Sequence, residues 1–351
     1  MSKSNQSKFF IKLFNWEYWN SNVVNAPMFF YWFYLSARAR SLFFFNASNP
    51  TIENGGMIME RKSGIYNQMP QAYYPKTLLI ESGISEIEMK KSIEDNNFNF
   101  PLIVKPDIGG KGRGVKKIQN IEAAIAFIKL ADFPMLVQEL VTYKYEVGIF
   151  YYRFPWQENG QISGIVSKDF LAVVGDGANT IEYLLTQNPR YILQLAVLKK
   201  MQDLNLNEIL KAGEEKIIVP FGNHARGAKF IDDSAKINAK LEKNIDAICK
   251  QTPGFYFGRL DVMYDNWQDL EAGKNLSIIE LNGAGSEPTH IYDPKHSIFF
   301  AWYEIARHIK IMWRIAMYNH KNEGIPFIKF KAGIKMFRDL LKVEAKLDKL
   351  I

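Results

Sequence analysis

The chain has 351 residues, of which 47% are hydrophobic and 23% are charged, a balance that indicates a folded protein and excludes disordered, collagen-like and coiled-coil classes. Its single cysteine, Cys249, excludes an internal disulfide framework and a cysteine-based zinc site, and it favours a reducing compartment such as the cytoplasm. The sequence does not open with a basic start followed by a short apolar run, so we expect no secretory signal.

The net charge of +7 is concentrated at the carboxyl end. Residues 307–351 contain 11 Lys or Arg against 4 Asp or Glu, and this surplus of 7 equals that of the whole chain. The preceding sequence is therefore neutral overall. This distribution argues against a nucleic-acid groove through the core, so we expect no nucleic-acid partner, and it indicates an anionic surface contacted by one end of the molecule.

Residues 1–48 form an aromatic-rich N-terminal segment. Of the 37 residues from Phe9 to Phe45, 15 are aromatic, against 14% of the whole chain. The longest uncharged stretch, 18–37, contains Asn, Ser and Pro and ends before Arg38 and Arg40, which makes it a poor membrane-spanning segment. Two interpretations stay open: an aromatic face packed on the main domain, or a helix or hairpin lying in a membrane interface.

The remaining chain predicts an α+β fold. Residues 49–75 are typical of a linker, with breakers at Pro50 and at the Gly55–Gly56 pair. Strand and helix patterns then alternate through a first subdomain, 76–145, and a second, 146–300, before a basic helical tail, 301–351. We expect strands at 76–80, 102–105, 115–118, 135–141, 148–154, 161–167, 216–219, 256–264 and 276–281, and helices at 85–96, 121–130, 181–185, 191–204 and 235–250.

The first candidate site is a glycine-rich basic loop that follows a strand. Lys105 ends an apolar strand, where a lysine is costly unless an anion or carboxylate meets it. Glycines allow backbone N–H groups to approach phosphate oxygens, and nearby cations neutralise their charge. The loop predicts a phosphate cover made of Gly109, Gly110, Lys111, Gly112, Arg113, Gly114 and Lys116. The alternative is a flexible hairpin; the pattern is neither a Walker loop nor a dinucleotide fingerprint.

The second candidate site is a pair of glutamates, Glu139 and Glu146, placed seven residues apart near strand ends. Both can face one cleft. Glu139 would lie beside the backbone groups that hydrogen-bond to an adenine, and Glu146 would accept hydrogen bonds from ribose hydroxyls. The alternative is that both are solvated.

The third candidate site is a set of oxygen ligands late in the chain. Asp261 and Glu280 each lie inside an apolar strand, and Asn282 shares the face of Glu280 because alternate residues of a strand point the same way. Two carboxylates and an amide oxygen suit Mg²⁺ or Mn²⁺. Arg259, on the face of Asp261, would point toward a transferred phosphoryl group. The alternative is a pair of buried, ion-paired carboxylates.

Together these residues resemble the ATP-grasp enzymes, and within them the D-alanine–D-alanine ligase-like and cyanophycin-synthetase-like carboxylate-amine ligases. The resemblance covers about residues 76–294. It is carried by the order of the three sites together with Lys168, Gly175–Asp176–Gly177, Thr180–Ile181, Asn223 and Arg226–Gly227.

The resemblance implies an ATP-grasp fold in which two α+β subdomains sandwich a nucleotide. It places Lys105 and Lys168 on phosphates, Glu139 and Leu140 at the adenine, Glu146 on the ribose, and two magnesium ions on Asp261, Glu280 and Asn282. An early nucleotide lysine would be Lys62 or Lys76. Ligases of this type carry a full domain before the first ATP-grasp strand, whereas this chain has a short aromatic region there, so D-alanine specificity is not implied. Gly285 and Ser286 would line the acceptor pocket.

The function expected from these sites is an ATP-dependent ligase that joins a small-molecule carboxylate to an amine through an acyl phosphate, releasing ADP. Arg259, Arg226 and Lys168 would stabilise the transferring phosphoryl group. The alternative is a membrane-surface-associated nucleotide-binding protein whose ATP-grasp core is catalytically weak or dead. Its support is the aromatic segment and the tail, where apolar residues recur at helical spacing among basic ones: Ile334, Phe337, Leu340 and Leu341 among Lys331, Lys335, Arg338 and Lys342.

Overall fold

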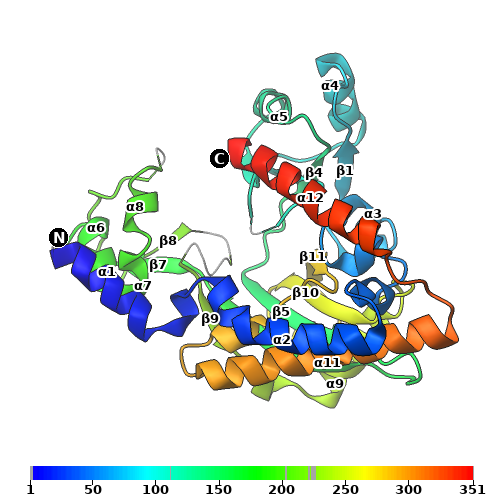
Figure 1. The fold of residues 1–351 in the computed structure, drawn as a ribbon. Helices are drawn as coiled ribbons and strands as arrows, with labels where there is room; N and C mark the ends of the chain where they lie inside the picture. Colours follow the sequence, from blue (N-terminus) through cyan, green and yellow to red (C-terminus); the bar gives the residue numbers. More distant parts are fainter. Residues whose placement is uncertain (1–2, 111, 202–203, 220–221, 223–226, 351) are drawn as a thin grey trace.

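The computed structural model describes residues 3–110, 112–201, 204–219, 222 and 227–350. Its named strands form three antiparallel sheets (Figure 1). A four-stranded sheet has the order β1 (Thr77–Ile80), β4 (Met135–Glu139), β2 (Leu102–Pro106) and β3 (Lys116–Ile118). A five-stranded sheet has the order β11 (Leu276–Asn282), β10 (Phe257–Tyr264), β5 (Tyr145–Tyr152), β6 (Gln161–Asp169) and β9 (Lys229–Asp232). A two-stranded sheet pairs β7 (Leu171–Val174) with β8 (Glu215–Val219).

The helices surround these sheets. Their bounds are α1 (Lys3–Phe14), α2 (Ser21–Ala39), α3 (Lys62–Tyr66), α4 (Glu86–Asp95), α5 (Ile121–Ile128), α6 (Ile181–Thr186), α7 (Pro189–Ile192), α8 (Leu195–Leu198), α9 (Ala239–Cys249), α10 (Trp267–Glu271), α11 (Ile298–Asn322) and α12 (Phe330–Leu347). The predicted α+β fold with hairpins is confirmed. Among the described residues, none of the helices combines the length and apolar character needed to cross a bilayer.

The four-stranded sheet packs against α4 and α5. Ile93 of α4 and Ala124 of α5 are buried with Leu102 and Val104 of β2, so one apolar cluster holds the sheet and both helices together. Sequence chemistry sets the start of each helix. Ser85 and Glu88 form the predicted capping box, and the Asn120 side chain accepts from the backbone of α5.

The five-stranded sheet uses its two faces differently. Alternate residues of β5, including Ile149, are buried with Leu241 and Ile245 of α9. The intervening residues point to the opposite face, where Phe150 packs in the cluster that includes Ile311 and Ile315 of α11. The same face carries Glu146 and Gly148 farther along β5, because residues two apart share a face. This face is therefore covered by α11 at one end and holds polar residues at the other.

The aromatic N-terminal segment is divided between core and surface. Figure 1 shows α2 lying along α11, and Trp302 and Trp313 of α11 donate from Nε1 to the carbonyls of Val24 (2.8 Å) and Leu35 (3.0 Å). After α2, Phe44 and Phe45 are fully buried, and each of these side chains stabilises the fold by roughly 1.5–3 kcal/mol. On the outer side of α2, however, Phe30 is 79% exposed. The packed interpretation therefore holds for one side of the segment.

Several predicted boundaries are wrong. The helix expected over 191–204 is replaced by α7 and α8, each of four residues, and residues 202–203 of that range lie outside the described residues. Arg190 of α7 is held in a buried ion pair with Glu17 (2.7 Å). The helix expected from 235 begins at Ala239, because the Asn238 side chain caps it. The short strands β7 and β9 are not predicted, β4 ends two residues earlier than expected, and β5 begins three residues earlier.

Candidate functional site

The three predicted metal ligands lie together on the five-stranded sheet. Asp261 of β10 is directly opposite Glu280 of β11, and Arg259 is opposite Asn282. Opposed residues of an antiparallel pair share a face, with Cβ atoms about 4.5–5.5 Å apart. Asp261 is buried, whereas the Glu280 side chain is partly exposed. The sheet thus brings two carboxylates and one amide to a single patch.

Cations converge on the buried carboxylate of this patch. Arg259 donates to both oxygens of Asp261, from Nε to Oδ1 (3.1 Å) and from Nη2 to Oδ2 (3.2 Å). Lys168 of β6 lies 3.1 Å from Asp261 Oδ1 and 2.5 Å from Glu146 Oε1. Three strands of the same sheet, β5, β6 and β10, therefore contribute to one network of charges, and the ion-paired arrangement weighed from the sequence is present.

The network shifts the pKa values of its members. Burial alone would raise the pKa of Asp261, but Arg259 and Lys168 outweigh it and lower that pKa to about 2. Burial alone would lower the pKa of Lys168, but the carboxylates of Asp261 and Glu146 raise it. Asp261, Lys168 and Arg259, whose pKa is also raised, are consequently charged at neutral pH.

The residues fit a divalent cation of the magnesium type. Asn282 has a buried Nδ2 with no hydrogen-bond partner, so its amide is free to rotate and present Oδ1 instead. Among the residues that the structure describes, no cluster of three or more His, Cys, Asp or Glu side chains could hold a metal ion. The donor set on offer is two carboxylates and one amide, which is a hard oxygen set.

Lys105 lies where the two larger sheets meet. Its Nζ donates to Gln138 Oε1 (2.8 Å), to Tyr66 Oη (3.1 Å) and to the carbonyl of Ile279 in β11 (3.3 Å). Burial lowers its pKa to about 8, a shift that Glu280 and Asp107 only partly offset. A buried ammonium with neutral acceptors lacks a contacting counter-charge, which an anion such as phosphate would supply.

The structure separates the two early lysines. Lys62 lies 3.5 Å from Glu280 Oε1, and its Nζ also donates to the carbonyl of Gly109 in the glycine loop. Lys76 instead donates to the carbonyl of Asn96, away from these groups. Of the two early lysines, Lys62 is therefore the one that joins the glycine loop to β11.

The glycine loop is covered by the end of the chain. Arg113 pairs with Glu344 of α12 (2.7 Å) and with Asp348 (3.4 Å). A Cβ built on Gly109 would lie 2.8 Å from the Leu347 side chain. Gly109, Gly112 and Gly114 have positive φ, which L residues rarely adopt, whereas Gly110 has open space around its Cβ position. Lys111 lies outside the described residues.

The predicted adenine residues lie at the passage between the two larger sheets. Glu139 ends β4 and its backbone N–H donates to the carbonyl of Lys76 (3.0 Å), while Leu140 begins the segment that leads to β5. Both are half-buried. Near Lys168, a Cβ on Gly222 would lie 2.4 Å from that side chain, so only glycine fits there. Asn223 and Arg226 lie outside the described residues.

The predicted acceptor residues are packed against the N-terminal region. The Gly285 backbone N–H donates to the carbonyl of Gly56 (2.8 Å), and a Cβ on Gly285 would lie 2.2 Å from the Met57 carbonyl oxygen. Ser286 Oγ donates to the carbonyls of Asn282 (3.2 Å) and Gly283. Its hydroxyl therefore donates to its own loop, and the expected donation to a substrate would require it to turn.

Apart from Lys62, the contacts that residues 49–75 make with the site were not predicted. This segment supplies Lys62, and Tyr66 Oη donates to the carbonyl of Ile279 (2.5 Å). It also supplies Glu60, whose Oε2 is buried without a hydrogen-bond partner and whose pKa is raised by burial. The Gly55–Gly56 pair was the available signal, because adjacent glycines permit the close backbone contact seen with residues 283–285.

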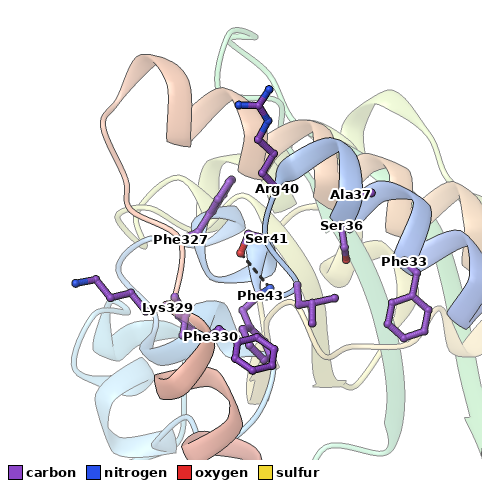
Figure 2. A pocket seen from close by; sticks show the side chains of 11 residues that line it. Phe33, Ser36, Ala37, Arg40, Ser41, Phe43, Phe327, Lys329 and Phe330 are labelled. Atoms are coloured by element: carbon purple, nitrogen blue, oxygen red, sulfur yellow. Dashed lines mark hydrogen bonds between the residues drawn. The ribbon is translucent and has the colours of Figure 1, made fainter.

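Two hollows on the described surface lie elsewhere. One lies between α2 and α12 (Figure 2), and the other is lined by Lys12, Tyr18, Trp19, Asn20 and Val23. Neither is lined by a predicted site residue.

Comparison with known proteins gave structural matches only. No protein-family model matches the sequence. No curated protein matches it. Three similar solved structures are a bifunctional glutathione synthetase from Pasteurella multocida (15% identity), a D-alanine–D-alanine ligase from Bacillus anthracis (14%) and the VanG D-Ala:D-Ser ligase from Enterococcus faecalis (16%).

Each of these three matches has a TM-score of 0.41. The matches cover 76%, 75% and 74% of this chain and 36%, 69% and 62% of the respective structures, so the chain spans about a third of the length of the synthetase.

Proposed function

We propose that this protein is an ATP-dependent carboxylate-amine ligase that forms an acyl phosphate and releases ADP. The observation that supports this most is the charged patch: Lys168 and Arg259 converge on Asp261, and Glu280 and Asn282 lie on the adjacent strand. Lys62 connects that patch to the glycine loop. A set of cations and hard oxygen ligands beside a glycine loop suits a nucleotide triphosphate.

In this proposal the nucleotide lies between the two larger sheets. Lys105 and Lys168 contact phosphates, Glu139 and Leu140 hold the adenine, and Glu146 accepts from the ribose. Asp261, Glu280 and Asn282 hold Mg²⁺ or Mn²⁺, which when bound supplies positive charge that neutralises phosphate oxygens. To do so, Asp261 exchanges part of its contact with Lys168 for the metal, and the released ammonium is then available to phosphate.

The reaction has two steps. An ionised substrate carboxylate attacks the terminal phosphorus of ATP, so an oxygen–phosphorus bond forms, the bond to ADP breaks, and an acyl phosphate results. The amine then attacks the acyl carbon, phosphate leaves with the bonding electrons, and the nitrogen loses a proton. Arg259, together with Arg226 from the undescribed segment, stabilises the charge of the transferring group. Closure of the loop 107–114 keeps water from the acyl phosphate.

The test is ADP and phosphate release measured with ATP, Mg²⁺ and pairwise mixtures of amino acids, short peptides and lipid-linked carboxylates. We expect release only when one carboxylate is paired with a specific amine. Asp261→Asn should lower that release about 100-fold or more. Asp95→Asn, an exposed aspartate on α4, is the matched control and should leave it unchanged. Release that needs no amine, or that survives Asp261→Asn, would contradict the proposal.

A second candidate is a membrane-surface-associated nucleotide-binding protein with a weak or dead core. The observation that favours it is charge compensation: Asp261 already has two cations and Glu280 has Lys62, so a metal must compete with them. This candidate predicts that ATP binds, measured by calorimetry, while every substrate mixture leaves ADP release at background.

We propose a cytoplasmic location, where ATP is available, for either function. The buried thiol of Cys249 is consistent with a reducing compartment. The proposed partners are a small-molecule carboxylate, an amine and a membrane surface contacted from one side. Fractionation of cells that express the full chain, with and without a high-salt wash, tests this location.

A further inference from the structure

Helix α12 presents an apolar line to solvent. Its residues Phe330, Ile334, Phe337 and Leu341 are 62%, 40%, 41% and 65% exposed. Their spacing of four, three and four residues places them in one row along the helix. Gly333 and Leu347 of the helix are buried, and Phe43 packs beside Gly333. Each of the four large apolar side chains in the row nevertheless keeps at least 40% of its surface exposed.

A basic row runs beside this apolar row. At 100° per residue, Lys331, Lys335, Arg338 and Lys342 fall on the adjacent side of the helix, and all are exposed. Lys335 and Lys342 pair with Asp339, at 2.8 Å and 3.2 Å, which is the one acidic residue among them. Apolar residues flanked by Lys and Arg are typical of helices that lie in the headgroup layer of an anionic membrane.

The outer side of α2 continues the apolar surface. Phe30 and Phe33 are exposed and three residues apart, so they share one side of the helix, with Phe29 and Tyr34 exposed on either side of them. Arg38 and Arg40 end the helix on the exposed side. The same pairing of exposed aromatics with cations therefore occurs on both helices.

A groove joins the two helices. It has a volume of about 580 Å³ and is lined by residues of both, including Phe33 on one side and Phe330 on the other. Phe43 lies between them, with its ring centroid 6.1 Å from that of Phe330 and 6.1 Å from that of Phe337. Figure 2 shows Arg40 and Lys329 extending away from the groove at its edges. The apolar surface is thus continuous from α2 to α12, with cations at its rim.

We propose that this α2–α12 face docks on a membrane surface that contains anionic lipid. Charge complementarity selects this occupant: the basic row and the rim arginine and lysine match lipid phosphates and carboxylates, while the phenylalanines enter the acyl boundary. The surplus of 7 positive charges in residues 307–351 adds attraction from the same end of the chain. An apolar protein partner or a second copy would gain from the phenylalanines but would leave the cations without a counter-charge.

The test is co-sedimentation of the full chain with vesicles of phosphatidylcholine alone and with phosphatidylserine added. We expect binding to the serine-containing vesicles that weakens as salt rises. Phe30→Ser with Phe337→Ser should weaken it at least about tenfold. Lys331→Gln with Arg338→Gln should weaken it about 30-fold and remove the preference for phosphatidylserine. Exposed residues of α4 give matched controls, Ile87→Ser and Lys91→Gln, which should bind like the unmodified chain.

Two results would overturn this proposal. One is vesicle binding that is the same in the α2–α12 variants as in the α4 controls. The other is sedimentation velocity showing a dimer that Phe30→Ser with Phe337→Ser converts to a monomer, which would assign the face to a second copy. Neither readout depends on ADP release, so the outcome is independent of the proposed ligase activity.

Discussion

Lys105 and Lys168 are both buried lysines proposed to contact phosphate, but their surroundings differ. Lys168 lies against the carboxylates of Asp261 and Glu146, and its pKa is raised. Among the described residues, Lys105 contacts only neutral acceptors, the side chains of Gln138 and Tyr66 and the Ile279 carbonyl, and its pKa is lowered to about 8. The five-stranded sheet therefore supplies carboxylates that neutralise Lys168. The four-stranded sheet instead holds the positive charge of Lys105, which a bound anion would neutralise.

The largest expected effect on stability comes from removing Asp261, the carboxylate that neutralises Lys168. Asp261→Asn leaves Lys168 and Arg259 buried with one carboxylate between them, so the free energy of unfolding should fall by about 3–5 kcal/mol. Urea unfolding measures this loss. Asp95→Asn, which removes an exposed carboxylate of α4, is the control. A loss as small as that of the control would mean that the two cations are solvated.

The next effect concerns Lys105 and pH. Its folded pKa of about 8 lies below its ordinary value of 10.5, so the unfolded chain binds more protons between these values and stability should rise with pH across this window. Relative to Lys105→Met, the native chain should gain at most about 3 kcal/mol between pH 8 and 10.5. Unfolding of both chains at several pH values measures the difference. Parallel curves would show that Lys105 is not desolvated.

Glu60 offers a smaller test with a charge of the opposite sign. Burial raises its pKa above the ordinary 4.5, so the stability linked to its protonated form is present below pH 4.5 and is lost as pH rises through the folded pKa. Glu60→Gln should therefore stabilise the protein by about 1 kcal/mol at neutral pH and have no advantage at pH 4. Thermal unfolding at both pH values measures this. Destabilisation at neutral pH would indicate that Glu60 holds a cation.

The smallest effect concerns Arg113 in the glycine loop, which, unlike Lys105, already has carboxylate partners. Glu344→Gln with Asp348→Asn would release Arg113 from α12 with little change in stability, because these pairs are partly exposed. The ATP concentration at half-maximal ADP release should fall about threefold. Asp132→Asn is the matched control, since it removes the contact of Asp132 with Lys346 of the same helix and spares Arg113. An equal change in both variants would assign the effect to α12 docking alone.

Much of the fold was predicted from interactions between residues that are close in sequence. The capping box of Ser85 and Glu88 and the Asn120 cap placed α4 and α5, and apolar runs placed β2, β10 and β11. Carboxylates inside apolar strands also indicated the patch, since Asp261 and Glu280 are opposed in the sheet as their strand positions allowed. These features depend on neighbours close in sequence.

Contacts between distant segments could not be predicted. Residues 49–75 show no strong periodicity, yet Lys62 and Tyr66 reach β11, more than 200 residues later in the chain. The pairing of Arg113 with Glu344 joins segments 231 residues apart. Arg190 of α7 likewise has its ion-pair partner, Glu17, in the N-terminal region. Tertiary packing decides such features, and one sequence does not reveal which partners meet.

Helix α12 links the exposed apolar surface at its start to the glycine loop at its end. Its 18 residues form a rod about 27 Å long, with the exposed Phe330 and Phe337 on its first half and Leu347 against Gly109 at its far end. Because a helix of this length moves as one body, a tilt of its first half would also shift its contact with the glycine loop.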